Sequence, residues 1–165
     1  MSDARDAESM PAWPPLGRIA GLDYGTVRIG VAVTDPDRNF ASPLATYARQ
    51  SPVADADYFR RVVREERIAG FVVGLPVFPS GDESPKSREA RRFGEWLAQV
   101  TERPVVYYDE RYSTVVADEY LAQGRMTNKR RKERRDQLAA QVLLVSFLES
   151  GQRPTSQAEP LSDGA

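Results

Sequence analysis

The sequence contains neither cysteine nor histidine. Their absence excludes thiolate chemistry, zinc sites built from Cys and His, and every catalytic arrangement in which imidazole is the base. An enzyme of this composition must draw on Asp, Glu, Lys, Tyr, Ser or Thr. Carboxylates without nitrogen or sulfur ligands suit hard cations, so a metal site here is expected to bind Mg²⁺ or Mn²⁺. The lack of disulfides is consistent with a reducing compartment.

Long apolar runs are absent as well. No stretch approaches the ~20 apolar residues that a membrane-spanning helix needs. The first fifteen residues lack the basic and then apolar pattern of a signal peptide. We therefore expect a cytoplasmic protein with no membrane partner.

The two ends of the chain differ in composition from its middle. The 165 residues suffice for one domain with a core but not for two of ordinary size. Both ends are polar and rich in proline or small residues. We expect a disordered extension over residues 1–16, one domain over residues 17–150 and a disordered tail over residues 151–165.

Strand and helix patterns alternate within the domain. Strands are predicted at residues 18–22, 29–34, 42–49, 70–75 and 104–108. Helices are predicted at 54–67, from Ser84-Pro85 onward, at 113–123 and at 135–150, with a basic loop at 124–134. Three strands followed by alternating helices and strands predict an α/β fold with a mixed sheet covered by helices.

Acidic residues follow two of the predicted strands. Asp23 ends the first strand, and Asp109 and Glu110 end the last. A carboxylate that leaves a buried strand is costly unless it is paired, hydrogen-bonded or bound to a cation. Asp23 could instead accept hydrogen bonds from the amides of the following turn. Because neighbouring strand residues face opposite sides, only one of Asp109 and Glu110 should face the same point as Asp23, and the other could pair with Arg111.

A third acid lies on the last predicted helix. Asp136 shares a face with Ala139, Ala140 and Leu143, and the small alanines allow a close approach to the sheet. The helix dipole alone could also explain an acid in a first turn. If the three carboxylates converge, they could hold one or two Mg²⁺ ions and support phosphodiester cleavage.

Seven of the eleven residues from Arg125 to Arg135 are basic. Such a run is often only a solvated surface. Here it directly precedes Asp136, and a phosphate-attracting loop beside a metal site is what a nuclease requires. Few aromatic residues accompany it, which favours recognition of the nucleic-acid backbone over reading of bases.

A competing interpretation comes from residues 21–26. Their sequence, GLDYGT, resembles the first phosphate loop of actin-like ATPases and sugar kinases. That fold normally needs two such domains to close on ATP, and this chain has room for one. Nucleotide binding is therefore the third-ranked hypothesis.

Four segments together resemble the YqgF (RuvX) family. They are GLDYGTVRIGVA at 21–32, VGLP at 73–76, DERYST at 109–114 and DQLAA at 136–140. They occur in the family's order over about residues 17–150. Two positions depart from the family pattern: Tyr112, and Arg135, which could pair with Asp136 when metal is absent. The resemblance implies an RNase H-like fold, with a central mixed five-stranded sheet flanked by helices, and a divalent-metal nuclease site.

Site residues follow from the resemblance motif by motif. Asp23, Glu110 and Asp136 are the expected catalytic and metal-binding residues, with Asp109 as a fourth metal ligand. The residues expected to bind nucleic acid are Arg28, Arg111, Thr114, Lys129, Arg130, Arg131, Lys132 and Arg134.

The resemblance also implies a substrate. Family members are described as nucleases that mature the 5′ end of pre-16S rRNA and as Holliday junction resolvases. We expect a hydrolase of phosphodiester bonds that processes structured pre-rRNA, with branched DNA as the alternative substrate. A factor that binds nucleic acid during ribosome assembly without cleaving it is the alternative from another class. A homodimer is suggested only by analogy with junction enzymes, which make two cuts.

Overall fold

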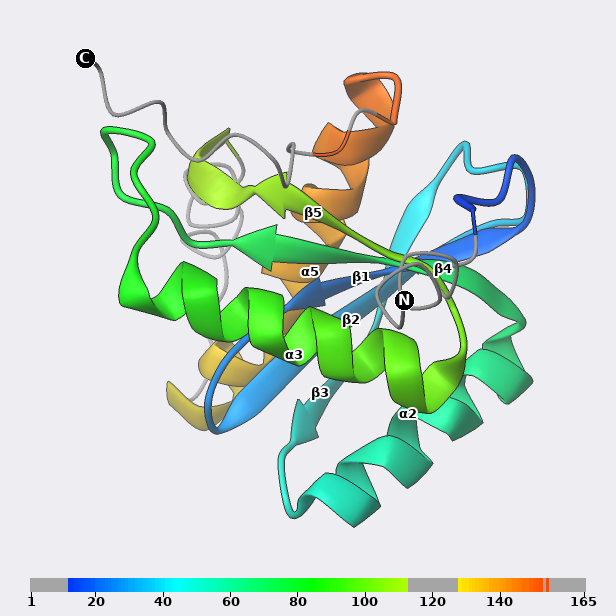
Figure 1. Cartoon of the computed structure of the whole chain (residues 1–165), viewed down its shortest axis with the longest axis horizontal. Helices are drawn as coiled ribbons and strands as arrows, with labels where there is room; N and C mark the ends of the chain where they lie inside the picture. Colours follow the sequence, from blue (N-terminus) through cyan, green and yellow to red (C-terminus); the bar gives the residue numbers. More distant parts are fainter. Residues whose placement is uncertain (1–11, 113–127, 153, 155–165) are drawn as a thin grey trace, which may run out of the picture.

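The computed structural model describes residues 12–112, 128–152 and 154 (Figure 1). The elements, in chain order, are β1 (Arg18–Asp23), β2 (Arg28–Thr34), β3 (Ala41–Ala48), α2 (Pro52–Glu66), β4 (Ile68–Leu75), α3 (Pro85–Thr101), β5 (Val105–Asp109), the 3₁₀ turn η1 (Glu110–Tyr112) and α5 (Asn128–Glu149). The five predicted strands are confirmed, with bounds that differ by one or two residues.

The strands form one mixed sheet in the order β3-β2-β1-β4-β5. The β1–β2 and β2–β3 pairs are antiparallel, whereas β1, β4 and β5 run parallel. The three parallel strands therefore end at one edge of the sheet, where Asp23, Leu75 and Asp109 lie. Sites in such sheets gather at the carboxyl ends of strands.

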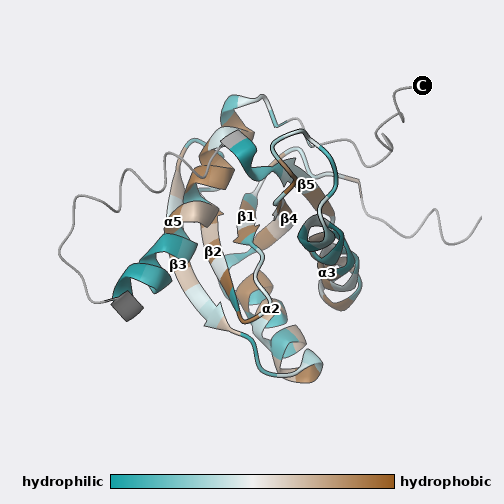
Figure 2. Ribbon diagram, turned by 90° about the vertical axis from the view of Figure 1, so that its left-hand side faces the viewer, coloured by the Kyte–Doolittle hydropathy of each residue, from teal (hydrophilic) through white to brown (hydrophobic). Residues whose placement is uncertain are grey.

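Helices cover both faces of the sheet. The helices α2 and α3 lie on one side, and α5 lies on the other (Figures 1 and 2). Alternation along each strand divides the buried residues between two clusters. Leu22, Val31 and Phe71 pack toward Phe59 of α2 and Phe93 of α3. On the opposite face, Ile19, Ala32 and Val72 pack against Leu143 and Phe147 of α5. Full burial of each large side chain is worth about 1.5–3 kcal/mol, so both clusters contribute to the fold.

The starts of α2 and α3 follow from the same sequence signal. Ser51 caps α2 by accepting a hydrogen bond from the amide of Ala54, and Pro52 is the first helical residue. Ser84 caps α3 in the same way, through the amide of Ser87, and Pro85 follows it. Proline suits the first helical position because its missing N–H would have no partner there. The predicted start of α3 is confirmed.

The predicted basic loop is wrong from residue 128 onward. Helix α5 begins at Asn128 and not at Arg135, so the basic residues up to Arg135 occupy its first two turns. Lys and Arg are good helix formers, and residues 128–135 contain no Gly or Pro. These turns carry no apolar period because their side chains are largely exposed, so the pattern that marks a buried helix begins only further along. The predicted helix at 113–123 lies outside the described residues.

Residues just outside the predicted domain, on both sides of it, pack against the domain. Trp13 packs edge-on against Phe147, with ring centroids 6.0 Å apart. Arg38 donates hydrogen bonds to the carbonyl of Pro14 at 2.8 Å and to Gln152 at 2.7 Å. Part of the segment expected to be a disordered extension is thus held against the domain, while residues 1–11 lie outside the described residues. No helix of the described ranges is both long enough and apolar enough to cross a membrane.

Candidate active site

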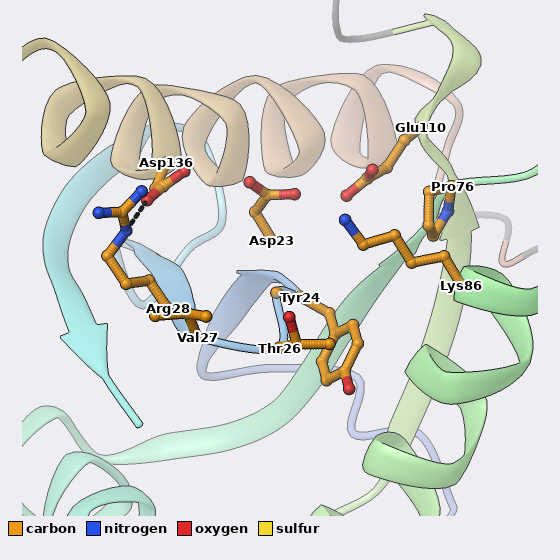
Figure 3. A pocket seen from close by; sticks show the side chains of 10 residues that line it. Asp23, Tyr24, Thr26, Val27, Arg28, Pro76, Lys86, Glu110 and Asp136 are labelled. Atoms are coloured by element: carbon orange, nitrogen blue, oxygen red, sulfur yellow. Dashed lines mark ion pairs between the residues drawn. The ribbon is translucent and has the colours of Figure 1, made fainter. Parts of the chain in front are cut away.

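A pocket of about 300 Å³ opens at the carboxyl edge of the parallel strands (Figure 3). Its walls come from the β1–β2 loop, the start of α3, the residue after β5 and helix α5. The residues that line it are Asp23, Tyr24, Gly25, Thr26, Val27, Arg28, Pro76, Lys86, Glu110 and Asp136. Three of the four acids predicted as ligands, Asp23, Glu110 and Asp136, therefore border the same space.

Strand alternation explains why Asp23 and Glu110 meet. Ile19 and Val106 face α5, and every second residue after them does the same. That parity places Asp23 and Glu110 on the α5 side and Asp109 on the other. Gly74 of β4 lies between them, and a Cβ there would overlap the Glu110 carboxylate. The expectation that only one of the two adjacent acids faces Asp23 is confirmed, and that acid is Glu110.

The carboxyl groups of Asp23 and Glu110 are hydrogen-bonded to each other. Burial raises the pKa of Glu110 well above its ordinary value of 4.5, and the neighbouring Asp23 charge raises it further. Burial is also the largest cause of the raised pKa of Asp23. Two adjacent buried carboxylates cannot both ionise cheaply, so burial and proximity favour one protonated carboxyl in this pair. A cation bound between them would compete with that proton.

Asp136 enters the pocket from α5. The backbone of α5 at Asp136 lies directly on Gly30 of β2, where a Cβ would overlap the Asp136 carbonyl. Burial raises the pKa of the Asp136 carboxyl, and Arg28 partly offsets the shift. The Nε of Arg28 lies 3.3 Å from Oδ2 in an ion pair. That Oδ2 is buried and has no hydrogen-bond partner of good geometry, so the interaction with Arg28 is mainly an ion pair. Arg28 forms an ion pair with Asp136, and the charge of Arg135 also lowers the pKa of this carboxyl.

The three acids surround the pocket without forming one cluster. Across residues 12–112 and 128–152, no three acidic side chains are close enough to hold one ion between them. Asp136 is turned to Arg28, and Asp23 to Glu110 (Figure 3). The three acids nevertheless fit a hard cation, because all their ligand atoms are carboxylate oxygens. In addition, Asp136 Oδ2 is a buried acceptor without a hydrogen-bond donor. Asp136 would have to turn toward Asp23 to complete the set.

Asp109 lies outside the pocket. Its Oδ1 accepts a hydrogen bond from the amide of Arg111 at 2.9 Å, and its Oδ2 accepts one from Arg111 Nε at 2.7 Å. Arg111 also donates to the carbonyl of Pro79 at 3.2 Å. Both oxygens of Asp109 are thus engaged by Arg111. This pair braces the end of β5 and is not directed at Asp23.

The other predicted nucleic-acid residues fall in three places. Arg28 lines the pocket. Arg130, Arg131, Lys132 and Arg134 are exposed on the first turns of α5. Thr114 and the side chain of Lys129 lie outside the described residues.

Lys86 also belongs to the site, although it was not among the residues predicted from the sequence. This lysine lies in the first turn of α3, and its ammonium group points at the Asp23–Glu110 pair (Figure 3). Its positive charge lowers the pKa of both carboxyl groups. A cation is unfavourable beside the positive end of a helix dipole. A lysine directly after the Ser-Pro helix start, at the carboxyl edge of the sheet, was therefore a signal available in the sequence.

Two curated proteins with similar sequences share one name. A relative from Rhodopirellula baltica, named "Putative pre-16S rRNA nuclease", is 51% identical over 138 residues, which cover 84% of this chain and 80% of the relative. A relative of the same name from Rhodobacter capsulatus is 41% identical over 138 residues, covering 84% and 87%.

Among solved structures, RuvC of T. thermophilus in complex with a Holliday junction substrate superposes with a TM-score of 0.55 at 15% identity, covering 84% of this chain and 98% of that one. This likeness shows the RNase H-like fold of RuvC-type resolvases. The profile of the RuvX family, described as Holliday junction resolvase, matches residues 17–150. That span contains all five strands and every residue of the pocket, and the chain belongs to the RuvX family.

Proposed function

We propose that this chain is a divalent-metal-dependent endonuclease that cleaves phosphodiester bonds in precursor 16S rRNA. The observation that carries the proposal is the hydrogen-bonded Asp23–Glu110 pair at the carboxyl edge of the sheet, with Asp136 on the facing helix. Membership of the RuvX family supports nuclease chemistry. The printed name of the relatives supports the RNA substrate.

Asp23 and Glu110 would hold Mg²⁺ or Mn²⁺, and Asp136 would join them after turning from Arg28. A divalent cation bound there supplies an activated water and offsets the charge of the phosphate. Glu110 must release its proton before it can act as a ligand. Asp109 supports Glu110 from the neighbouring position by fixing Arg111 at the strand end.

Two cationic side chains would contact the scissile phosphate. Arg28 borders the pocket beside Asp136, and Lys86 borders it beside Glu110 (Figure 3). Arg28 presents a planar fork that can bind two phosphate oxygens, and Lys86 acts as a point charge. The exposed basic residues on the first turns of α5 would hold the substrate backbone further along. Thr114 and Lys129 keep their predicted role in nucleic-acid binding.

Two alternative functions have specific support. The family description and the RuvC complex favour a four-way DNA junction as a second substrate class. A factor that binds precursor rRNA without cutting it would keep the fold and the basic turns. Metal-dependent turnover separates this factor from both enzymes.

The test compares cleavage of a labelled pre-16S 5′-leader RNA with that of a four-way DNA junction. Each is incubated with Mn²⁺, Mg²⁺ or EDTA, using wild type and Asp23→Asn. The matched control is Asp57→Asn, because Asp57 is an exposed residue of α2 remote from the pocket. We expect metal-dependent cutting of the RNA by wild type and the control, and a loss of at least a hundredfold with Asp23→Asn.

The outcomes separate the functions. Cutting of the junction alone, also lost in Asp23→Asn, would make the protein a resolvase. Binding of RNA without cutting in any metal would favour the assembly factor. Full cleavage by Asp23→Asn would overturn the site itself.

We assign the nuclease domain to residues 17–150, the span matched by the family profile, with residues 1–16 and 151–165 as extensions. A precursor rRNA substrate would place the protein in the cytoplasm. A homodimer is expected if the substrate is a junction with two symmetric cuts.

A further inference from the structure

A second pocket, of about 330 Å³, adjoins the first. We call it the aromatic pocket. Its aromatic walls are Tyr24, Phe93 and Trp96, its charged residues are Arg49, Glu89 and Arg92, and Pro52 completes the lining. Its volume is at the lower end of the ~300–1,000 Å³ typical of small-ligand sites, which suits one planar group better than a duplex.

The aromatic pocket shares a wall with the catalytic pocket. Tyr24 directly follows Asp23 and lines both pockets. Helix α3 also links them, because Lys86 borders the catalytic pocket whereas Glu89, Phe93 and Trp96 border the aromatic one. These four residues are spaced by three or four positions, so they form one stripe along the helix. At 1.5 Å per residue, Lys86 and Trp96 are ~15 Å apart along the axis.

The aromatic rings are held in place but are not fully covered. Phe93 is buried and forms the base of the group, 5.2 Å from the Tyr24 ring and 5.6 Å from the Trp96 ring, centroid to centroid. Tyr24 and Trp96 are only partly buried, so each leaves ring surface open to the pocket. A flat aromatic ligand could stack on that surface.

Arg49 is fixed beside these rings. Its guanidinium lies 5.6 Å from the centroids of both Tyr24 and Phe93 and donates a hydrogen bond to the Tyr24 hydroxyl at 3.4 Å. Its Nε lies 3.4 Å from Asp55, a buried carboxylate that also accepts hydrogen bonds from the Tyr47 hydroxyl at 2.6 Å and the Gln50 amide at 3.0 Å. Arg49 is therefore preorganised, and Arg92 adds an exposed positive charge at the rim.

We propose that the aromatic pocket binds an unstacked nucleobase of a single-stranded segment of the substrate, a few nucleotides from the scissile phosphate. The base would stack on Trp96 and Tyr24, and the adjoining phosphate would meet Arg92. Aromatic platforms beside arginines suit unpaired bases, whereas bases stacked in a duplex cannot reach them. At ~3.4 Å per stacked nucleotide, the ~15 Å between Lys86 and Trp96 spans about four nucleotides.

This inference rests on the proposed nucleic-acid substrate, but it goes beyond it. The basic turns of α5 bind the backbone of any strand, paired or unpaired. The aromatic pocket requires a single-stranded stretch on the α3 side of the catalytic pocket. It thus specifies a single-stranded stretch beside the cleavage site as a feature of the preferred substrate.

The test uses the two tryptophans of the chain, Trp13 and Trp96. Trp13→Phe leaves Trp96 as the only tryptophan whose fluorescence is measured. Trp96→Phe leaves Trp13 in the same role. Both are made in the Asp23→Asn background and titrated in EDTA with three RNAs: a single strand, the same strand in a duplex, and single strands with one abasic position each. We expect the single strand to quench Trp96 but not Trp13. The duplex should not quench Trp96. Among the abasic single strands, the one that lacks the base bound in the pocket should also fail to quench it.

Affinity provides the second readout. Replacing a stacking aromatic typically weakens binding of single strands by about five- to hundredfold, so Trp96→Ala should do so while duplex binding is unchanged. Arg92→Gln tests the same pocket at an exposed position that cannot disturb the core, and it should weaken single-strand binding about tenfold. Arg88→Gln, exposed on the same helix but outside both pockets, should have no effect.

Several results would overturn the inference. One is RNA binding without Trp96 quenching, and another is equal quenching by single strand and duplex. A third is unchanged affinity in both Trp96→Ala and Arg92→Gln, which would leave the rings as a cover for the core. Quenching without cleavage by the wild-type protein would support the aromatic pocket and count against the nuclease, whereas cleavage without quenching would do the reverse.

Discussion

The charges of the catalytic pocket balance when one proton is counted. Three acids, Asp23, Glu110 and Asp136, face two basic side chains, Arg28 and Lys86. The raised pKa of Glu110 favours a proton on the Asp23–Glu110 pair, and that proton would supply the third positive charge. A divalent cation that enters must displace this proton and act against the nearby ammonium of Lys86. The charge of Lys86 therefore weakens metal binding but strengthens phosphate binding.

Lys86→Met tests this opposition at a single residue. Methionine keeps the length and helix propensity of the side chain and removes its charge. We expect the affinity for Mn²⁺ alone, measured by titration calorimetry, to rise about two- to tenfold because a repulsive charge is lost. We expect kcat/KM for RNA cleavage at saturating metal to fall about 10- to 100-fold because a donor to the phosphate is lost.

Arg88→Met is the matched control for that measurement. Arg88 lies on the same helix, is exposed and does not line the pocket. It should leave both quantities within about twofold of wild type. Weaker Mn²⁺ binding in Lys86→Met would mean that the lysine supports the carboxylates and does not compete with the metal.

At the scale of elements, α5 shows what sequence patterns can and cannot reveal. Its buried half was predictable because Ala140 and Leu143 repeat at helical spacing. Its first two turns were not, because exposed basic residues give the same pattern in a loop and in a helix. Asp136 therefore lies two turns inside α5, and the helix dipole that could have explained a first-turn acid does not act there.

The strands gave clearer information. Alternation predicted that Asp109 and Glu110 diverge, but it could not choose between them without the register of β5 against β4. The partner of Asp136 was also out of reach, because Arg28 meets Asp136 only through the antiparallel return of β2 beneath α5. Local patterns thus gave the candidates, and long-range pairing selected among them.

The basic turns of α5 should make the affinity for nucleic acid depend strongly on salt concentration. Substituting Arg130, Arg131 and Arg134 with Gln should keep the helix, since Gln is also a good helix former. Each lost phosphate contact reduces the slope of log K against log salt by about 0.7–0.9, so the triple variant should lower it by about 2–3. Filter binding or anisotropy over a range of salt concentrations measures the slope.

Helix α2 supplies a control with the same spacing. Arg60, Arg61 and Arg64 are exposed arginines on the far side of the sheet from α5. Their triple substitution with Gln makes the same change in net charge. If both triple variants change the slope equally, net charge and not the position of the basic turns governs binding.

At the scale of the whole molecule, the buried carboxyl pair links folding to pH and to metal. A folded-state pKa raised above the unfolded value means that the folded protein binds more protons in the interval between the two. Stability must then fall as pH rises through that interval. For Glu110 the interval begins near its ordinary value of 4.5 and extends to the raised value, and Asp23 acts in the same direction.

We therefore expect the metal-free protein to lose thermal stability as the pH rises above about 5, where acidic groups of ordinary pKa no longer titrate. Glu110→Gln keeps the hydrogen bond of the protonated acid without a titrating group, so its melting temperature in EDTA should depend less on pH and exceed that of wild type at pH 8. Mg²⁺ at a hundredfold excess over its Kd should stabilise wild type by about 2.7 kcal/mol, and much less in Glu110→Gln. For a chain of this size, each kcal/mol of stabilisation raises the melting temperature by roughly 2–4 °C. A wild-type melting temperature that rises with pH in EDTA would show that the pair does not bind a proton on folding. Equal stabilisation of both proteins by Mg²⁺ would show that the metal binds at another site.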